Sequence, residues 1–208
     1  NMSILGLKMV KELRGEPCFN MITKWTRKKS IMTSRTFGNE VKSFKKLAQA
    51  ISTYANMCAT KLRKENSCAK DLHIMIFTNP FKKNNSINYQ GFRTIRLDTP
   101  TNDSLEIVSN AMKALRGIYR PDCLYKRAGV IVSKIVPKSK VQLNLFNKGQ
   151  NTQKRQKLMI AIDQLNDNYG RMKIRFAVNG FEKKIILKQQ NLSPCYTTRI
   201  SDLMHIRG

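Results

Sequence analysis

Acidic residues are scarce in this chain, which has 13 Asp and Glu against 39 Lys and Arg in 208 residues. The formal net charge is +26 and the pI is about 10.3. A field of this size attracts polyanions and raises their encounter rate. The basic residues recur along the whole chain among apolar ones, and a hydrophobic fraction of 41% can build a core. This is typical of a folded basic protein and not of a disordered arm. The composition indicates a nucleic-acid partner, with an anionic membrane surface as the competing one.

Long apolar runs are also missing. No stretch approaches the ~18 apolar residues that are needed to cross a bilayer, and the sequence shows no signal-peptide pattern. These features exclude a membrane-spanning helix and favour nucleic acid over a membrane as the partner. We expect a cytoplasmic protein with no membrane partner.

Metal-ligand patterns are equally rare. The chain has two histidines and five scattered cysteines, and no two cysteines form a C-x-x-C pair. A zinc site needs such spacing, so we expect reduced, structural thiols and no metal site. His73 lies inside an apolar strand pattern, which favours a core or edge histidine over a ligand. The cysteines are Cys18, Cys58, Cys68, Cys123 and Cys195.

The chain lacks catalytic signatures. It has no P-loop, no Gly-x-Ser-x-Gly motif and no Cys–His pairing. Two catalytic Mg²⁺ ions about 3.5–4 Å apart need clustered carboxylates, and a metal-dependent nuclease needs a similar cluster. The acidic residues stand alone in positions that fit caps, turns and solvated faces, so we expect neither catalysis nor a cofactor in this chain. The acidic residues considered are Asp71, Asp98, Asp103, Glu106, Asp163 and Asp167.

The most informative segment that is present is Gln142-Leu-Asn-Leu-Phe146. In an extended peptide, Leu145 and Phe146 can enter an apolar pocket, Leu143 can cover its rim, and the Gln142 amide can hydrogen-bond the pocket wall. Bacterial replication proteins dock on the sliding clamp through peptides of this form. Chance produces such a match in roughly 0.3% of chains this long, and an amphipathic strand is the alternative. The flanking segments have turn and linker chemistry, which favours a displayed loop.

Hydrophobic periodicity predicts an α+β fold. Four segments have the pattern of strands, and two long segments have apolar residues at helical spacing. Their order is strand, helix, strand, strand, helix, strand, and Asp103 or Ser104 can cap the second helix. Two such halves form a four-stranded antiparallel sheet with two helices on one face, the βαββαβ arrangement. The expected strands are residues 30–37, 72–77, 91–97 and 127–136, and the expected helices are residues 41–62 and 105–118.

The sheet face opposite the helices is the expected nucleic-acid surface. Thr33, Arg35, Thr94 and Arg96 alternate with apolar residues, so we expect them on this face. Hydroxyl and guanidinium groups suit hydrogen bonds to phosphate oxygens. Few Asn or Gln side chains are present to hydrogen-bond base edges, so we expect contacts along the DNA backbone with little recognition of base sequence. The residues predicted to contact DNA are Thr33, Ser34, Arg35, Arg93, Thr94, Lys126 and Arg127.

Both ends of the chain carry further elements. Residues 5–13 have a helical period that stops at Gly15, so we expect this chain to be a piece of a longer protein. Residues 153–165 read as a helix, and Asn179-Gly180 is a turn pair that can join strands 171–178 and 183–187. This predicts a small C-terminal helix-hairpin unit, followed by an extended tail.

Several motifs form an ordered series that spans nearly all of the chain. They are Glu12-Leu-Arg-Gly-Glu-Pro-Cys18, Ser34-Arg-Thr-Phe-Gly38, Thr78-Asn-Pro-Phe81, Tyr125-Lys-Arg-Ala-Gly129, Gln142-Leu-Asn-Leu-Phe146, Phe176-Ala-Val-Asn-Gly180, Ser193-Pro-Cys-Tyr-Thr-Thr-Arg199 and Ser201-Asp-Leu203. In this order the chain resembles the C-terminal half of UmuC-type chains, the catalytic chains of DNA polymerase V in the Y family of translesion DNA polymerases.

The resemblance implies four regions. It also implies error-prone translesion synthesis in the SOS response, with template–primer DNA, a bacterial sliding clamp, a UmuD-type dimer and a recombinase filament as partners. The Mg²⁺-binding carboxylates of the family belong to a palm domain that precedes residue 1, which makes this fragment non-catalytic and its parent a DNA-directed DNA polymerase. The implied regions are residues 1–29 (thumb end and linker), 30–136 (little-finger DNA-binding domain), 137–152 (linker with the clamp-binding peptide) and 153–208 (small C-terminal domain).

Two alternatives stay open. The chain could be a stand-alone basic RNA- or DNA-binding module without a polymerase role, which would need stacking aromatics on the open sheet face. We expect Phe37, Phe77 and Phe92 to point mostly toward the helices, which disfavours this reading. In the C-terminal region, Tyr196–Arg199 could dock on the UmuD-type partner or fold back in a structural role, and the structural role is favoured.

Overall fold

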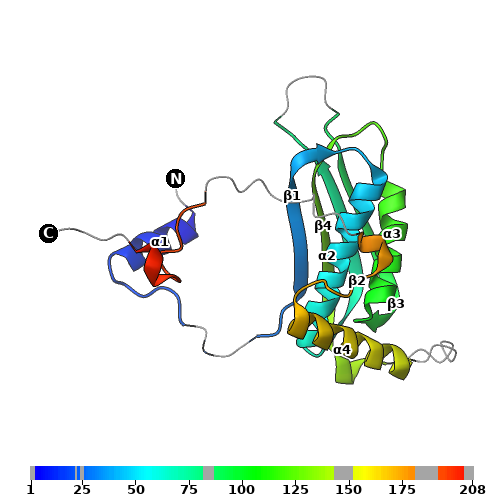
Figure 1. Cartoon of the computed structure of the whole chain (residues 1–208). Helices are drawn as coiled ribbons and strands as arrows, with labels where there is room; N and C mark the ends of the chain where they lie inside the picture. Colours follow the sequence, from blue (N-terminus) through cyan, green and yellow to red (C-terminus); the bar gives the residue numbers. More distant parts are fainter. Residues whose placement is uncertain are drawn as a thin grey trace.

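The computed structural model describes residues 3–21, 23, 26–81, 87–142, 152–180 and 192–203. A four-stranded sheet lies at its centre in the order β1-β4-β2-β3, and every neighbouring pair of strands is antiparallel. Two helices, α2 and α3, cover one face of this sheet (Figure 1). This confirms the predicted α+β fold. The elements are β1 (Ser30–Val41), α2 (Phe44–Lys64), β2 (Ser67–Thr78), β3 (Gln90–Thr101), α3 (Ser104–Ile118) and β4 (Tyr125–Pro137).

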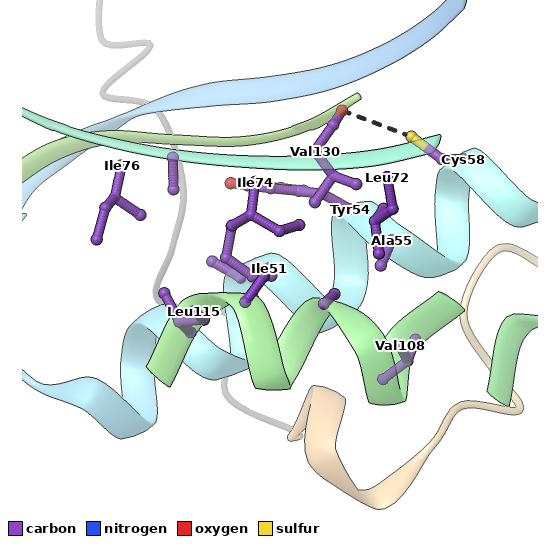
Figure 2. Packing of buried hydrophobic residues seen from close by; sticks show 14 of the residues in the cluster. Ile51, Tyr54, Ala55, Cys58, Leu72, Ile74, Ile76, Val108, Leu115 and Val130 are labelled. Atoms are coloured by element: carbon purple, nitrogen blue, oxygen red, sulfur yellow. Dashed lines mark hydrogen bonds between the residues drawn. The ribbon is translucent and has the colours of Figure 1, made fainter. Parts of the chain in front are cut away.

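The hydrophobic core lies between the sheet and the two helices. Leu72, Ile74 and Ile76 of β2 point toward the helices, where they meet side chains such as Ile51 and Leu115 (Figure 2). All five of these side chains are fully buried. Each contributes about 1.5–3 kcal/mol by leaving water, so this layer holds the sheet and fixes which of its faces is free.

Local signals set the ends of the helices. Asp103 caps α3, because its side chain accepts a hydrogen bond from the Leu105 N–H at 2.9 Å. This chooses between the two residues predicted for that cap. Helix α1 (Ile4–Leu13) ends before Gly15, whose φ of +85° lies in the left-handed region. Gly adopts that conformation at low cost, which confirms the predicted end of this helix.

The C-terminal region begins with α4 (Thr152–Tyr169), which confirms the predicted helix. The predicted hairpin is wrong in its first strand: residues 171–176 form turns and irregular backbone, and Ala177–Asn179 form the short 3-10 helix η2. The second strand, residues 183–187, lies outside the described residues.

Local polar contacts explain the irregular backbone after α4. The Asn166 side chain accepts from the Ile174 N–H and donates to the Ile174 carbonyl, both at 2.9 Å. These contacts occupy backbone groups that a strand would use.

The predicted extended tail is also wrong. Residues 196–198 form a turn, and Ile200–Asp202 form the 3-10 helix η3. The Asp202 carboxylate accepts from the Cys195 N–H at 2.9 Å, which closes this local fold. None of the helices in the described part of the chain is long and apolar enough to cross a membrane.

Candidate nucleic-acid interface

The strand register decides which side chains share the sheet face opposite α2 and α3, called the open face below. Directly paired residues of antiparallel strands lie on the same face, and neighbours along a strand lie on opposite faces. Ile74 and Val130 are paired, and both face the core. The residues before and after each of them along its strand therefore point the other way, onto the open face. Across β1, β4, β2 and β3, the open face consists of four rows: Ser30, Ser133, Asp71 and Arg96; Met32, Ile131, His73 and Thr94; Ser34, Gly129, Met75 and Phe92; Thr36, Arg127, Phe77 and Gln90.

The open face includes three of the predicted DNA contacts. Ser34, Thr94 and Arg127 all lie on it, together with Arg96. Ser34 and Arg127 lie close enough to interact, since the Arg127 guanidinium donates to Ser34 Oγ at 3.1 Å. The predicted placement of Thr94 and Arg96 on this face is therefore confirmed, whereas the contacts of Ser34, Thr94 and Arg127 with DNA stay a prediction.

The placement of Thr33 and Arg35 on the open face is wrong. Ser34 lies between them in β1, and the three residues cannot share one face because strand side chains alternate. Thr33 is only 6% exposed and accepts a hydrogen bond from Cys58 Sγ of α2 at 3.3 Å. Arg35 is exposed on the helix side of the edge strand β1, near Tyr54 of α2. Burial raises the pKa of Tyr54 to about 12, and the Arg35 cation opposes this rise.

Arg93 also lies off the open face, and Lys126 lies at a bulge of β4 where the register assigns it no partner. Arg93 pairs with Ile74 in the register, and its guanidinium occupies the space that a side chain at Gly117 of α3 would fill. Lys126 Nζ donates to the Gly38 carbonyl at 3.1 Å, which holds it at the β1–β4 end of the sheet. A contact between Arg93 and DNA would have to come from the rim of the domain.

An ion cluster lies at one end of the open face. Lys134 Nζ lies 2.7 Å from Asp71 Oδ2, and Arg96 Nε lies 4.0 Å from Asp71 Oδ1. The Lys134 hydrogen bond is the main cause that lowers the pKa of the Asp71 carboxyl, and burial opposes it. Sequence reasoning missed Lys134 because its φ of +51° breaks the strand alternation.

His73 lies in the middle of the open face and not in the core or at an edge strand. Its Nδ1 lies 2.8 Å from Thr94 Oγ1, and its Nε2 lies 2.7 Å from Ser133 Oγ. The ring stacks on Phe92 with centroids 5.7 Å apart and planes at 24°. Among the described residues, no three His, Cys, Asp or Glu side chains gather as a possible metal site. The donor set described here therefore does not fit the two-Mg²⁺ centre of a polymerase.

Aromatic residues on the open face are the main feature that sequence reasoning missed. Phe37 is buried in the core as predicted, but Phe77 and Phe92 lie on the open face. In β2, Leu72-His-Ile-Met-Ile-Phe77 is apolar at all positions except His73, so its pattern could not tell the two faces apart. The signal was in β3, where Gly91 and Ile95 mark the helix side and place Phe92 opposite.

The predicted clamp-binding peptide lies mostly outside the described residues. After β4, the chain forms the short 3-10 helix η1 (Lys138–Lys140), and Gln142 is exposed. Leu143, Leu145 and Phe146 are not among the described residues. Their role as a clamp-binding site stays a prediction.

The C-terminal region contacts the helix layer through α4. The Arg63 guanidinium binds the Asp163 carboxylate with Nε–Oδ2 at 2.6 Å and Nη2–Oδ1 at 2.8 Å. It also donates to the Asn102 carbonyl at 2.7 Å and to Ser104 Oγ at 2.9 Å. Met159 of α4 is buried. These contacts of α4 lie on the helix side of the sheet, so in the part of the chain that the structure describes α4 does not cover the open face.

Residues 28–145 match the model of the impB/mucB/samB family C-terminal domain. The chain belongs to this family. Residues 156–206 match a second model, which is described as a domain of unknown function, DUF4113. This membership and the relatives below confirm the resemblance to the C-terminal half of UmuC-type chains.

Curated relatives of this family member include proteins of Salmonella typhimurium and Escherichia coli. Protein UmuC of Salmonella typhimurium strain LT2 is 36% identical over 200 residues, which cover 96% of this chain and 47% of the relative. Protein ImpB of Salmonella typhimurium is 32% identical over 203 residues, covering 98% and 47%. Protein MucB of Escherichia coli is 33% identical over 191 residues, covering 92% and 44%. The chain thus spans about half the length of the curated relatives it matches.

Among solved structures, a Y-family DNA polymerase chimera of Dbh and Dpo4 matches with a TM-score of 0.39 and 12% identity, covering 64% of this chain and 35% of that chain.

Proposed function

We propose that this chain is the DNA-binding and clamp-tethering part of an error-prone translesion DNA polymerase that acts in DNA damage tolerance. The observation that carries the proposal is the free, basic sheet face in a chain of the impB/mucB/samB family. Arg96, Arg127 and Lys134 reach this face, and their side chains suit a phosphate backbone. The face tracks the backbone of the template–primer duplex, while catalysis belongs to another part of the parent polymerase with its Mg²⁺ ions.

Salt-dependent DNA binding tests the role of the open face. Neutralising about five phosphates makes log affinity fall with log salt at a slope of roughly −4.5. Arg127→Gln is expected to flatten this slope by about 0.9, because one phosphate contact is lost. The matched control is Arg116→Gln, which removes an exposed arginine of α3 on the other side of the sheet. An unchanged slope for Arg127→Gln, or a flat curve for the unmodified protein, contradicts the proposal.

A second step of the proposal assigns Gln142, Leu143, Leu145 and Phe146 to the sliding clamp. The supporting observations are the residue pattern and the exposed Gln142, which follows the sheet domain directly. Fluorescence anisotropy with a bacterial sliding clamp tests it. Micromolar or tighter binding is expected to disappear in Leu145→Ala/Phe146→Ala and to persist in Asn144→Ala, whose side chain lies between the anchors in sequence. Binding that survives the double substitution means that charge and not the peptide drives association.

The same proposal extends to the wider assembly. A UmuD-type dimer and a recombinase filament are the further partners, and SOS mutagenesis in the cytoplasm is the setting. The support is the identity to UmuC, ImpB and MucB across both matched regions. Co-purification of the full-length parent with a UmuD-type dimer, with and without residues 153–208, tests whether the C-terminal domain contributes to that contact.

One observation favours a second candidate function. The exposed Phe92 on the open face is the kind of residue that a stand-alone RNA-binding module needs. Competition between A-form RNA and a DNA duplex of equal length separates the two functions. Preference for the RNA duplex would favour the stand-alone module, and equal or weaker RNA binding favours the polymerase role.

A further inference from the structure

Phe92 is an aromatic side chain presented to solvent on the same face as Arg96 and Arg127. It is 55% exposed, although it lies in a regular strand next to the fully buried Ile76–Gly91 pair of the helix side. A single exposed apolar residue is ordinary on a protein surface. What distinguishes Phe92 is that its surroundings hold it in a defined orientation.

His73 provides that orientation. Both of its ring nitrogens have partners, Thr94 Oγ1 and Ser133 Oγ, on the two strands that flank β2. The imidazole is thereby held beside the Phe92 ring in an offset stacked arrangement, with centroids 5.7 Å apart and 24° between the planes. Fixing a ring before binding lowers the ordering cost that a ligand must overcome. One face of Phe92 is thus supported by His73, and part of the ring remains in solvent.

The charges around this aromatic pair suit a polyanion. Arg96 lies four residues along β3, which is about 13 Å at 3.3 Å per residue, and Arg127 lies in the neighbouring row of the sheet. Phe77 is a further partly exposed apolar residue of this face, whereas Met75 is buried. A ligand that combines flat apolar rings with a phosphate backbone matches this pattern.

We propose that Phe92, supported by His73, is a stacking site for an unpaired nucleobase of single-stranded DNA. This inference deepens the proposed function and rests on it. Stacking on an aromatic ring requires a free base face, which a single strand offers and the inside of a duplex does not. The cations then hold the flanking phosphates, so the open face binds a single strand as well as tracking a duplex.

Two strands of equal charge separate stacking from electrostatics. The probes are a fluorescent single-stranded oligothymidine and a strand of the same length whose sugars carry no bases. Phe92→Leu is expected to weaken oligothymidine binding by roughly tenfold, because base–aromatic stacking is lost, and to change binding of the baseless strand by less than twofold. The log–log salt slope is expected to stay unchanged, because no phosphate contact is removed.

Phe81→Leu is the matched control, since Phe81 is 88% exposed in the loop after β2 and outside the open face. It is expected to leave both affinities unchanged. His73→Gln is expected to give an intermediate loss on oligothymidine, because it removes the ring that stacks beside Phe92 and keeps a hydrogen-bonding side chain. Equal thermal midpoints for the variants exclude unfolding as the cause.

The outcomes are separable. Equal losses on both strands, or no loss on oligothymidine, overturn the stacking site. Duplex binding that persists with the expected salt slope while Phe92→Leu has no effect overturns this inference alone. An absence of binding to every strand at low salt overturns both the inference and the proposed function.

Discussion

Asp71 is a carboxylate on a basic surface, and its neighbours explain why it is tolerated there. Lys134 and Arg96 approach its two oxygens, so it is compensated locally and orients two cations that would otherwise be free to move. Lys134 lowers the pKa of the Asp71 carboxyl, because only the charged carboxylate benefits from the lysine. The residue therefore contributes to stability and to the arrangement of the open face together.

Replacing Asp71 with Asn gives a pH-dependent loss of stability. A carboxyl whose folded pKa is depressed stabilises the protein above its unfolded pKa, and this contribution is lost as the pH falls through the folded value. We expect Asp71→Asn to lower the free energy of unfolding by about 1 kcal/mol at pH 7, discounted because Lys134 is largely exposed. The difference is expected to shrink toward zero below the ordinary carboxyl pKa of 3.8. Urea unfolding of both proteins between pH 7 and pH 3 measures it.

Asp98→Asn is the control for this experiment, because Asp98 is an exposed carboxylate of β3, two residues after Arg96. It is expected to change the free energy of unfolding by less than 0.5 kcal/mol at every pH. A constant difference between the unmodified protein and Asp71→Asn across the whole range would exclude the ion cluster as its cause.

The cysteines divide into two reactivity classes. Cys58, Cys68 and Cys123 are buried, whereas Cys18 is half-buried and Cys195 is exposed. Burial raises the pKa of Cys58, and raises that of Cys68 to about 11. At pH 8 the thiolate fraction of Cys68 is on the order of one in a thousand. We expect iodoacetamide to modify Cys195 first and Cys18 next, and the buried thiols only after unfolding.

Mass spectrometry of peptides after timed alkylation measures these rates. Denaturation in urea before alkylation is the control and is expected to make all five thiols react. Rapid modification of Cys58 in the folded protein would contradict the packing of α2 against β1.

At the scale of elements, the helices and strands followed from hydrophobic periodicity because each buries one continuous face. The stripe through Leu47, Ile51 and Leu62 predicted α2, and it is fully buried. The open face could not be predicted as well, because polar residues occur on both sides of the edge strands. Thr33 and Arg93 belong to the helix side, where a hydroxyl meets Cys58 and a guanidinium lies over Gly117. Only the register shows which polar residues share a face.

The C-terminal elements were harder to predict for a related reason. Helix α4 has a weak apolar stripe, and polar contacts place it against α2. The Asn179-Gly180 pair indicated a hairpin, but Gly180 instead follows η2 with φ of +65°, and its backbone lies close to Gln49 of α2. A turn signal is local, whereas this conformation depends on a contact with a distant element.

The Arg63–Asp163 pair is the strongest polar link between α2 and α4. The Arg63 side chain is 9% exposed, so Asp163→Asn leaves a nearly buried guanidinium without its counter-ion. We expect a loss of about 3 kcal/mol, with faster hydrogen exchange concentrated in α4. The Lys64–Asp167 ion pair offers a matched comparison, because both of its side chains are 56% exposed. Asp167→Asn is expected to cost less than 0.5 kcal/mol.

Hydrogen exchange followed by mass spectrometry measures the local effect, and urea unfolding measures the global one. Equal costs for Asp163→Asn and Asp167→Asn would mean that the buried pair does not hold α4. A large global loss without faster exchange in α4 would indicate that Arg63 acts mainly through its contacts with Asn102 and Ser104.

At the scale of the whole molecule, the net charge of +26 acts on folding and on binding in opposite directions. Like charges repel one another in the compact state, so the same field that attracts a polyanion destabilises the free protein. Salt screens both effects over a Debye length of about 10 Å at 0.1 M. Ionic strength should therefore stabilise the fold while it weakens association with DNA.

This opposition gives a measurable pair of trends. Raising NaCl from 50 mM to 500 mM is expected to increase the thermal midpoint of the free protein by a few degrees, because self-repulsion is screened. Over the same range, affinity for a DNA duplex is expected to fall steeply. Differential scanning fluorimetry measures the first trend, with chloride used because sulfate also stabilises by exclusion from the protein surface. A midpoint that falls with NaCl would mean that local ion pairs such as Lys134–Asp71 outweigh the net repulsion. In that case ion pairs within the fold would offset more of the repulsion between positive charges than a net charge of +26 suggests.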